Sequence, residues 1–182
     1  VGQKKTLQKS LLISLIIGSS LVTMQRADIW ANPRLLINVW SSEHPHSLRA
    51  QTMKVGALMS ERRYLAAQEH LDVQRALWPR AIHLDLMYLN YMCAGYFNGG
   101  LELNKIIDKA SVGKYDGSLP SAFQETFRLF KVNKCELIDD ELMEALFLRI
   151  NAVGKIPSPA KAQFAILKME FYSLRRDLDK TI

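Results

Sequence analysis

The chain has 182 residues, of which 48% are hydrophobic and 23% are charged. This balance is typical of a folded domain with its own core and excludes a disordered chain. The formal charge of +6 is not gathered into a basic stripe interleaved with aromatic residues, so we expect no nucleic acid among the partners.

The first element is an uncharged, largely aliphatic run over residues 10–25, framed by Lys9 and Arg26. As a helix it spans roughly 24 Å at about 1.5 Å per residue, close to the hydrocarbon thickness of a bilayer when the flanking cations extend the span. Trp30 follows where an interfacial aromatic residue is expected. We therefore predict a transmembrane helix. A signal peptide, for which no typical cleavage site follows, and a buried core helix stay open as alternatives.

The charges around this run predict its orientation. Lys4, Lys5 and Lys9 precede it, whereas Arg26 after it is offset by Asp28. The positive-inside rule then places the N-terminal side in the cytoplasm. We expect an inner-membrane protein whose C-terminal part is periplasmic. A chain that starts at a valine is expected to be a piece of a longer protein, with this helix the last of several spans.

Everything after residue 28 has the 3–4 spacing of apolar residues that predicts helices. Asn32-Pro33 predicts a helix start, because asparagine caps helices and proline fits their first turn. Pro45 predicts the end of that helix. A loose linker is expected over 112–120. Further helices are predicted over 47–60, 64–78, 80–97, 101–111 and 121–132, from Asp139 or Asp140 to Gly154, and from 158 onward.

The last three predicted helices each have an apolar face. Phe123, Phe127 and Phe130 share a face, as do Leu142, Leu146 and Ile150. The last helix carries the most regular seam, which needs a partner surface within the domain or on another chain. Self-association through residues 159–178 is therefore one hypothesis. The seam consists of Ala160, Phe164, Leu167, Phe171, Leu174 and Leu178.

The stretch from residue 50 to 79 resembles a tetratricopeptide repeat, a pair of antiparallel helices of about 34 residues. The resemblance implies an all-α fold of stacked helical hairpins, a superhelix, preceded by one transmembrane helix. It divides the chain into a cytoplasmic stub with the membrane helix (1–27), the hairpins (28–112) and a divergent helical region (113–182). The residues at repeat positions are Trp40, Pro45, Gly56, Tyr64, Ala67, Leu71 and Pro79.

Residues 8–80 are also similar to bacterial multi-span membrane proteins that end in such a repeat domain. Many of those proteins resemble large-loop glycosyltransferases that use lipid-linked sugars. The resemblance implies that the parent protein is a glycosyltransferase or sugar ligase. It is carried by Trp30, Asn32, Pro33, Trp40, Pro45, Ser47, Arg49 and Ala50.

Histidines and cysteines give little support to a metal or cofactor site. His44 and His46 beside Glu43 lack a third fixed ligand and are better explained as solvated loop residues. His70 and His83 are expected at the surface or between hairpins. Cys93 and Cys135 have no zinc spacing, and whether they pair depends on an oxidising compartment. We expect no metal and no cofactor.

Catalytic groups are also weak. Asp139, Asp140 and Glu141 are better explained by helix capping than as a general-acid pair. No motif places a nucleophile beside a base, so the chain alone is not expected to be catalytic. A cluster of aromatic residues could line a ligand pocket but fits a core better. Its members are Tyr88, Tyr91, Tyr96 and Phe97.

The best candidate for a binding surface is basic. Cations in the groove of stacked hairpins could hold carboxylates of a protein partner or an anionic glycan. The alternative is a solvated polar face. The residues are Arg49, Lys54, Arg62, Arg63 and Arg80.

Three functions follow. The first is a membrane-tethered helical-repeat module that recruits a protein partner or positions an acceptor on the non-cytoplasmic side. The second is an accessory part of a membrane glycosyltransferase or sugar ligase. The third is a structural domain that self-associates.

Overall fold

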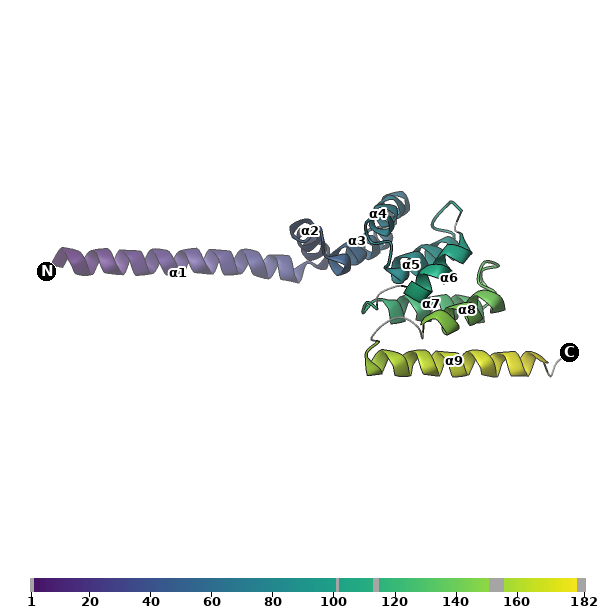
Figure 1. Cartoon of the computed structure of the whole chain (residues 1–182). Helices are drawn as coiled ribbons and strands as arrows, with labels where there is room; N and C mark the ends of the chain where they lie inside the picture. The colour runs from purple at the N-terminus through teal and green to yellow at the C-terminus, as the bar shows by residue number, and fades with distance from the viewer. Residues whose placement is uncertain (1, 101, 113–114, 151–155, 180–182) are drawn as a thin grey trace. The chain divides into compact units, whose positions relative to one another are not determined.

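A computed structural model describes residues 2–100, 102–112, 115–150 and 156–179, and these form helices and no strands (Figure 1). The all-α prediction is thus confirmed at the level of secondary structure. Contacts divide the chain into two units, Val1–Ala57 and Leu58–Ile182. The boundaries expected at residues 27 and 112 come from sequence patterns and stay predictions.

Helix α1 (Gly2–Ala31) is one uninterrupted helix of 30 residues (Figure 1). Its segment Leu11–Ala31, 21 residues, is long and apolar enough to cross a membrane, and none of it is buried. Leu11 and Ile16 are 64% and 56% exposed. The segment therefore does not fill a core here, and the helix extends beyond the predicted run.

Helices α2 (Pro33–Glu43) and α3 (Leu48–Ser60) begin and end close to the predicted positions. Asn32 caps α2, because its side-chain oxygen accepts a hydrogen bond from the Leu35 amide at 3.3 Å. The buried Gln51 of α3 donates to the carbonyls of Ser41 (2.8 Å) and His44 (3.2 Å). These bonds tie the end of α2 to α3.

The second unit is layered. Helices α4 (Tyr64–Leu77) and α6 (Leu103–Val112) both contact α5 (Ile82–Cys93). In the next layer α5 packs on α7 (Leu119–Lys131), and α6 packs on α8 (Asp140–Ile150). Helix α9 (Ser158–Asp179) then packs on α7 (Figure 1).

The helix predicted over 80–97 is too long at its C-terminal end. Gly95 adopts a left-handed φ of 77°. The Tyr96 amide donates to the Tyr91 carbonyl and the Gly95 amide to the Met92 carbonyl, both at 2.9 Å. This pair of bonds is the Schellman ending, which a glycine permits. Because the chain turns there, Phe97 folds back and its ring lies 5.0 Å from that of Tyr91.

The starts of α7 and α8 are set by different caps. Helix α7 begins at Leu119, two residues before the predicted start, because Pro120 fits the first turn of a helix. The predicted linker is therefore too long at its C-terminal end. Asp139 is the residue that caps α8, since its Oδ1 accepts from the Leu142 amide at 2.8 Å. The predicted end at Gly154 lies outside the described residues.

The core of the second unit is rich in phenylalanine. The predicted apolar faces of α7 and α8 are buried, except that Phe130 is only half-buried. The ring of Phe123 lies edge-on to Phe147 (4.9 Å) and Phe164 (5.5 Å). The seam of α9 is buried from Ala160 to Phe171, so this unit itself supplies the surface that the seam needs. Leu174 is 36% exposed, and the side chain of Leu178 is not described.

A disulfide joins Cys93, at the end of α5, to Cys135, in the turn after α7. The two Cα atoms are 5.1 Å apart, within the range for a bridge. The bridge encloses helices α6 and α7 in its loop. The pairing that the sequence left open is therefore present in the structure.

Candidate binding surface between α7 and α9

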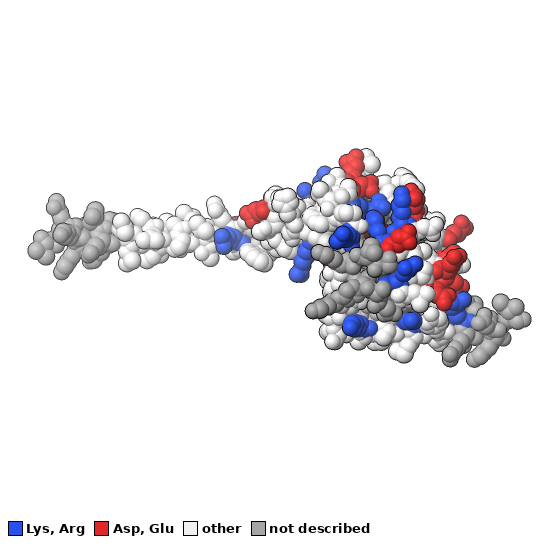
Figure 2. Space-filling model, viewed as in Figure 1, with Lys and Arg blue, Asp and Glu red and all other residues white. Residues whose placement is uncertain are grey.

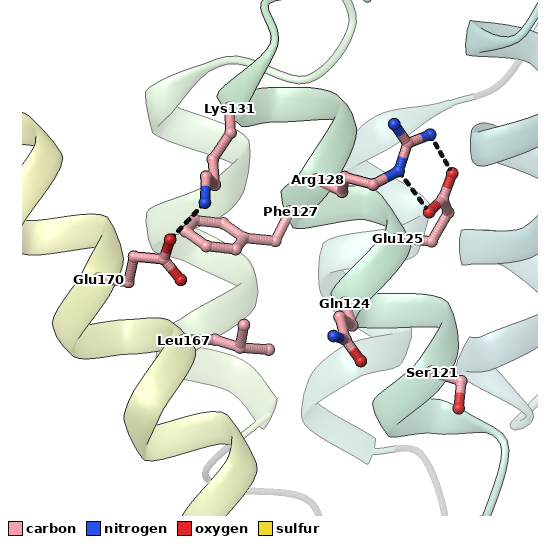
Figure 3. Close-up of a pocket in the computed structure, with 8 residues that line it drawn as sticks. All are labelled: Ser121, Gln124, Glu125, Phe127, Arg128, Lys131, Leu167 and Glu170. Carbon is pink, nitrogen blue, oxygen red and sulfur yellow. Dashed lines mark hydrogen bonds and ion pairs between the residues drawn. The ribbon is translucent and has the colours of Figure 1, made fainter.

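A groove of about 290 Å³ lies between α7 and α9 (Figure 3). Its apolar side chains are Phe127 from α7 and Leu167 from α9, both anchored in the core. Its polar side chains lie on the outer face of α7 at helical spacing, because residues three and four apart share a face. They are Ser121, Gln124, Glu125, Arg128 and Lys131, with Glu170 from α9.

Two polar bridges cross from one helix to the other. Lys131 forms an ion pair with Glu170 (Figure 3). Gln163 of α9 donates from Nε2 to Oε1 of Gln124 at 3.2 Å. All four side chains are at least partly exposed. Such exposed pairs contribute little stability, so the buried apolar residues hold the two helices together.

A second ion pair lies on α7 itself. Arg128 donates from Nε and Nη2 to the two carboxylate oxygens of Glu125, at 2.8 and 2.6 Å (Figure 3). These hydrogen bonds hold the pKa of Glu125 below its ordinary value. Burial raises the pKa of Tyr91 on α5, and the negative charge of Glu125 raises it further. The surface thus presents fixed charges of both signs around an apolar floor.

The predicted basic residues are divided between the two units of the structure. Arg49 and Lys54 lie on α3 five positions apart, about 140° around the helix. Arg62 and Arg63 precede α4, whereas Arg80 follows its end, so the length of α4, about 21 Å, separates them. Arg63 pairs with Glu61 at 3.5 Å. Their role in binding stays a prediction. On the visible face of the second unit, blue and red side chains are interspersed (Figure 2).

The residues at repeat positions have mixed environments. Ala67 and Leu71 are fully buried in α4, as close helix packing requires. Tyr64 stacks on Tyr96 with ring centroids 4.7 Å apart. Trp40 is half-buried. The residues at the remaining positions, Pro45, Gly56 and Pro79, are exposed.

The aromatic cluster, from α5 and the residues just after it, lies partly in the core, which the sequence favoured over a ligand pocket. Tyr88 and Phe97 are buried, with ring centroids 5.4 Å apart. Tyr91 is half-buried, and Tyr96 is 44% exposed. The Tyr88 hydroxyl accepts a hydrogen bond from Gln68 at 3.0 Å, so its polar end is satisfied.

His83 is buried, so of the two predicted positions the one at the surface is wrong. The ionic cluster beside it was not predicted from the sequence. His83 is 1% exposed, with Nδ1 3.2 Å from Asp116 Oδ2. Two residues on, the buried Asp85 accepts from Arg75 Nε (2.8 Å) and Lys109 Nζ (2.9 Å). The signal was present, because two polar residues interrupt an otherwise apolar helix start. His44 and His46 are exposed, and no group of three metal-binding side chains exists among the described residues.

Comparison with known proteins gives no family. No protein-family model matches the chain, and no curated protein or solved structure matches it significantly.

Proposed function

We propose that this chain is a membrane-tethered helical module that binds a protein partner on the non-cytoplasmic side of the membrane. The observation that carries the proposal is the exposed apolar helix α1, which precedes eight further helices in the described part of the chain. Eight exposed leucine, isoleucine and valine side chains between residues 11 and 22 would favour insertion by about 2–5 kcal/mol. In Figure 2 this stretch is a white surface without charge.

The disulfide supports the proposed location of the C-terminal part outside the cytoplasm. Bridges persist outside the cytoplasm and are rare in reducing interiors. Cys93 and Cys135 are paired and no free cysteine remains. This agrees with the excess of lysine before the helix, which favours a cytoplasmic N-terminus and a periplasmic C-terminal part.

The packing of the second unit supports a stack of hairpins like those of tetratricopeptide repeats. Helices α5 and α6 contact each other. Each of them also packs on a later helix of the chain, α5 on α7 and α6 on α8. Stacked hairpins bury a continuous core and leave grooves along their edges.

The groove between α7 and α9 is the surface we assign to the partner. Phe127 and Leu167 offer an apolar floor, while the rim carries fixed charges of both signs. A peptide segment with an apolar anchor between polar neighbours fits this arrangement. A photo-crosslinking residue at Gln124 should give adducts in intact membranes, whereas the same residue at Lys161, exposed on α9 outside the groove, should give none. Equal labelling at both positions would contradict this assignment.

Thiol trapping in intact cells tests the compartment. The full chain should resist alkylation by a maleimide until it is reduced, and should then take up two labels. Replacing Lys4, Lys5 and Lys9 by glutamate removes the charge bias that orients the helix, so this variant should contain reduced cysteines. If the unaltered chain is already labelled without a reductant, the proposal is wrong.

A further inference from the structure

The first unit contains a second groove, of about 500 Å³, between the last turns of α1 and helix α2, to which α3 adds Met53. Helix α1 contributes Arg26, Ile29 and Trp30, which share a face at spacings of three and four. Helix α2 contributes Leu36, Val39, Trp40 and Glu43 from one face in the same way. Two amphipathic faces thus meet in an apolar groove with one cation and one anion.

The position along α1 brings this groove to a membrane surface, if α1 spans the membrane as proposed. Arg26 directly follows the uncharged run 10–25, which is roughly 24 Å long as a helix. Arg26 would therefore lie at the level of the lipid headgroups. Trp30 is 70% exposed despite its size, as expected for a side chain that sits at the membrane interface.

The two charges of the groove are not paired within the part of the chain that the structure describes. Neither Arg26 nor Glu43 makes an ion pair with any residue that the structure describes. They lie on opposite helices and have opposite signs. A guanidinium binds phosphate through paired hydrogen bonds, and a carboxylate accepts hydrogen bonds from a primary ammonium. A ligand that carries both groups beside an apolar chain would satisfy both residues at once.

We propose that this groove binds a zwitterionic aminophospholipid, phosphatidylethanolamine in chemical class. Its phosphate meets Arg26, its ammonium meets Glu43, and the first part of an acyl chain lies along Ile29 and Leu36. Phosphatidylglycerol has the same phosphate and acyl chains but no ammonium, so it leaves Glu43 unsatisfied. The inference rests on the proposed membrane anchoring and adds the lipid class.

The test first separates anchoring from lipid choice. The full chain is reconstituted in vesicles whose lipids carry bromine near the headgroup end of the acyl chains. A Trp78→Phe variant, which retains Trp30 and Trp40, should lose fluorescence strongly, whereas a variant with only Trp78 should lose little. If the chain does not float with the vesicles, the anchoring itself fails.

Native mass spectrometry of the full chain in detergent then measures lipid choice. With matched acyl chains, phosphatidylethanolamine should bind about tenfold more tightly than phosphatidylglycerol, the effect of one charge-assisted hydrogen bond. Glu43→Gln should abolish this preference, and Arg26→Gln should weaken both lipids alike. Arg34→Gln is the control, because Arg34 is exposed on α2 outside the groove. If the unaltered chain floats with the vesicles but binds the two lipids with equal affinity, the lipid assignment is wrong and the membrane anchoring still holds.

Discussion

Asp85 is the residue on which the polar packing of the second unit depends. Its side chain is 3% exposed, and two cations from different helices reach it, Arg75 of α4 and Lys109 of α6. The Arg75 guanidinium also lies 4.3 Å from the centroid of the Tyr88 ring. One carboxylate therefore joins α4, α5 and α6 by charge.

Removing this charge should destabilise the unit. Asp85→Asn replaces two charge-assisted hydrogen bonds by weaker ones. It removes the anion of Lys109 and leaves Arg75 with only the exposed Asp72, a cost of about 2–4 kcal/mol. Asp72→Asn is the matched control, because Asp72 also pairs with Arg75, at 3.1 Å, but is 48% exposed. It should cost under about 1 kcal/mol. Urea unfolding measures both, and equal losses would contradict the role of burial.

His83 should make stability depend on pH. Burial lowers its pKa in the folded state, although Asp116 and Asp85 partly oppose this. The unfolded chain therefore binds a proton first as the pH falls below about 6.5, and the folded state loses stability by up to about 1.4 kcal/mol per pH unit. Above that pH the His83 side chain is neutral in both the folded and the unfolded state, so it no longer makes the stability depend on pH.

The comparison variant is His83→Asn, measured against its own stability at pH 7.5. Its free energy of unfolding should fall less steeply between pH 6.5 and 5 than that of the unaltered chain. Parallel pH profiles for the two proteins would show that His83 does not titrate in this way.

Among the elements, α1 and α9 both carry many apolar residues, but those of α9 are buried and those of α1 are exposed. The seam of α9 is buried against α7, because Phe164 and Phe171 meet the aromatic core. The aliphatic residues of α1 surround the helix on all sides, and none of the segment Leu11–Ala31 is buried. A helix that is apolar all round is typical of a membrane span or of the core of a large protein, and none of this segment is buried.

A charge in the middle of α1 should release the chain from the membrane. An arginine at the centre of a span costs about 3 kcal/mol, comparable to the whole favourable term of the run. Ile17→Arg should therefore move a large fraction of the chain from the carbonate-resistant membrane pellet to the supernatant. Ile166→Arg is the control, since Ile166 on α9 is 59% exposed and Ile17 is 56% exposed. Equal release by both variants, or by neither, would contradict a spanning role for α1.

Helix positions were largely predictable, because local signals set them. Asn32-Pro33, Pro79 and the apolar spacing of α8 each placed a helix correctly. The errors have local causes too: Gly95 ended α5 early, and Pro120 belonged to the first turn of α7. Gly95 can lie inside a helix or just after its end, and Pro120 can lie in a linker or in the first turn of a helix. The sequence alone does not distinguish these positions.

The candidate surface was not predictable from spacing alone. Gln124, Arg128 and Lys131 are polar residues on α7, and they border a groove only because α9 packs beside them. Contacts between residues far apart in the sequence, such as Lys131 with Glu170, carry no local signal. The same holds for Asp85, whose partners come from two other helices.

At the scale of the whole molecule, the disulfide is a single covalent link across the second unit. It joins residues 42 apart in the sequence. Closing a loop of that length removes conformational entropy from the unfolded chain, worth about 4 kcal/mol. The bridge therefore adds to a core that is already continuous through α7, α8 and α9.

Loss of the bridge should lower stability without changing the fold. The variant Cys93→Ala with Cys135→Ala should lose about 3–4 kcal/mol in urea unfolding. The reduced unaltered protein should lose the same amount, and the variant should not respond to a reductant. A reductant effect on the variant, or no effect on the unaltered chain, would contradict this account of the bridge.

The most direct test of the central claim is protease access to the C-terminal unit in sealed membrane vesicles. The full chain carries a short epitope after Ile182, and right-side-out and inverted vesicles are treated with the same protease. We predict that the epitope is lost from right-side-out vesicles and protected in inverted ones. Protection in the opposite orientation, or an epitope that never sediments with membranes, would contradict the tethered, non-cytoplasmic module.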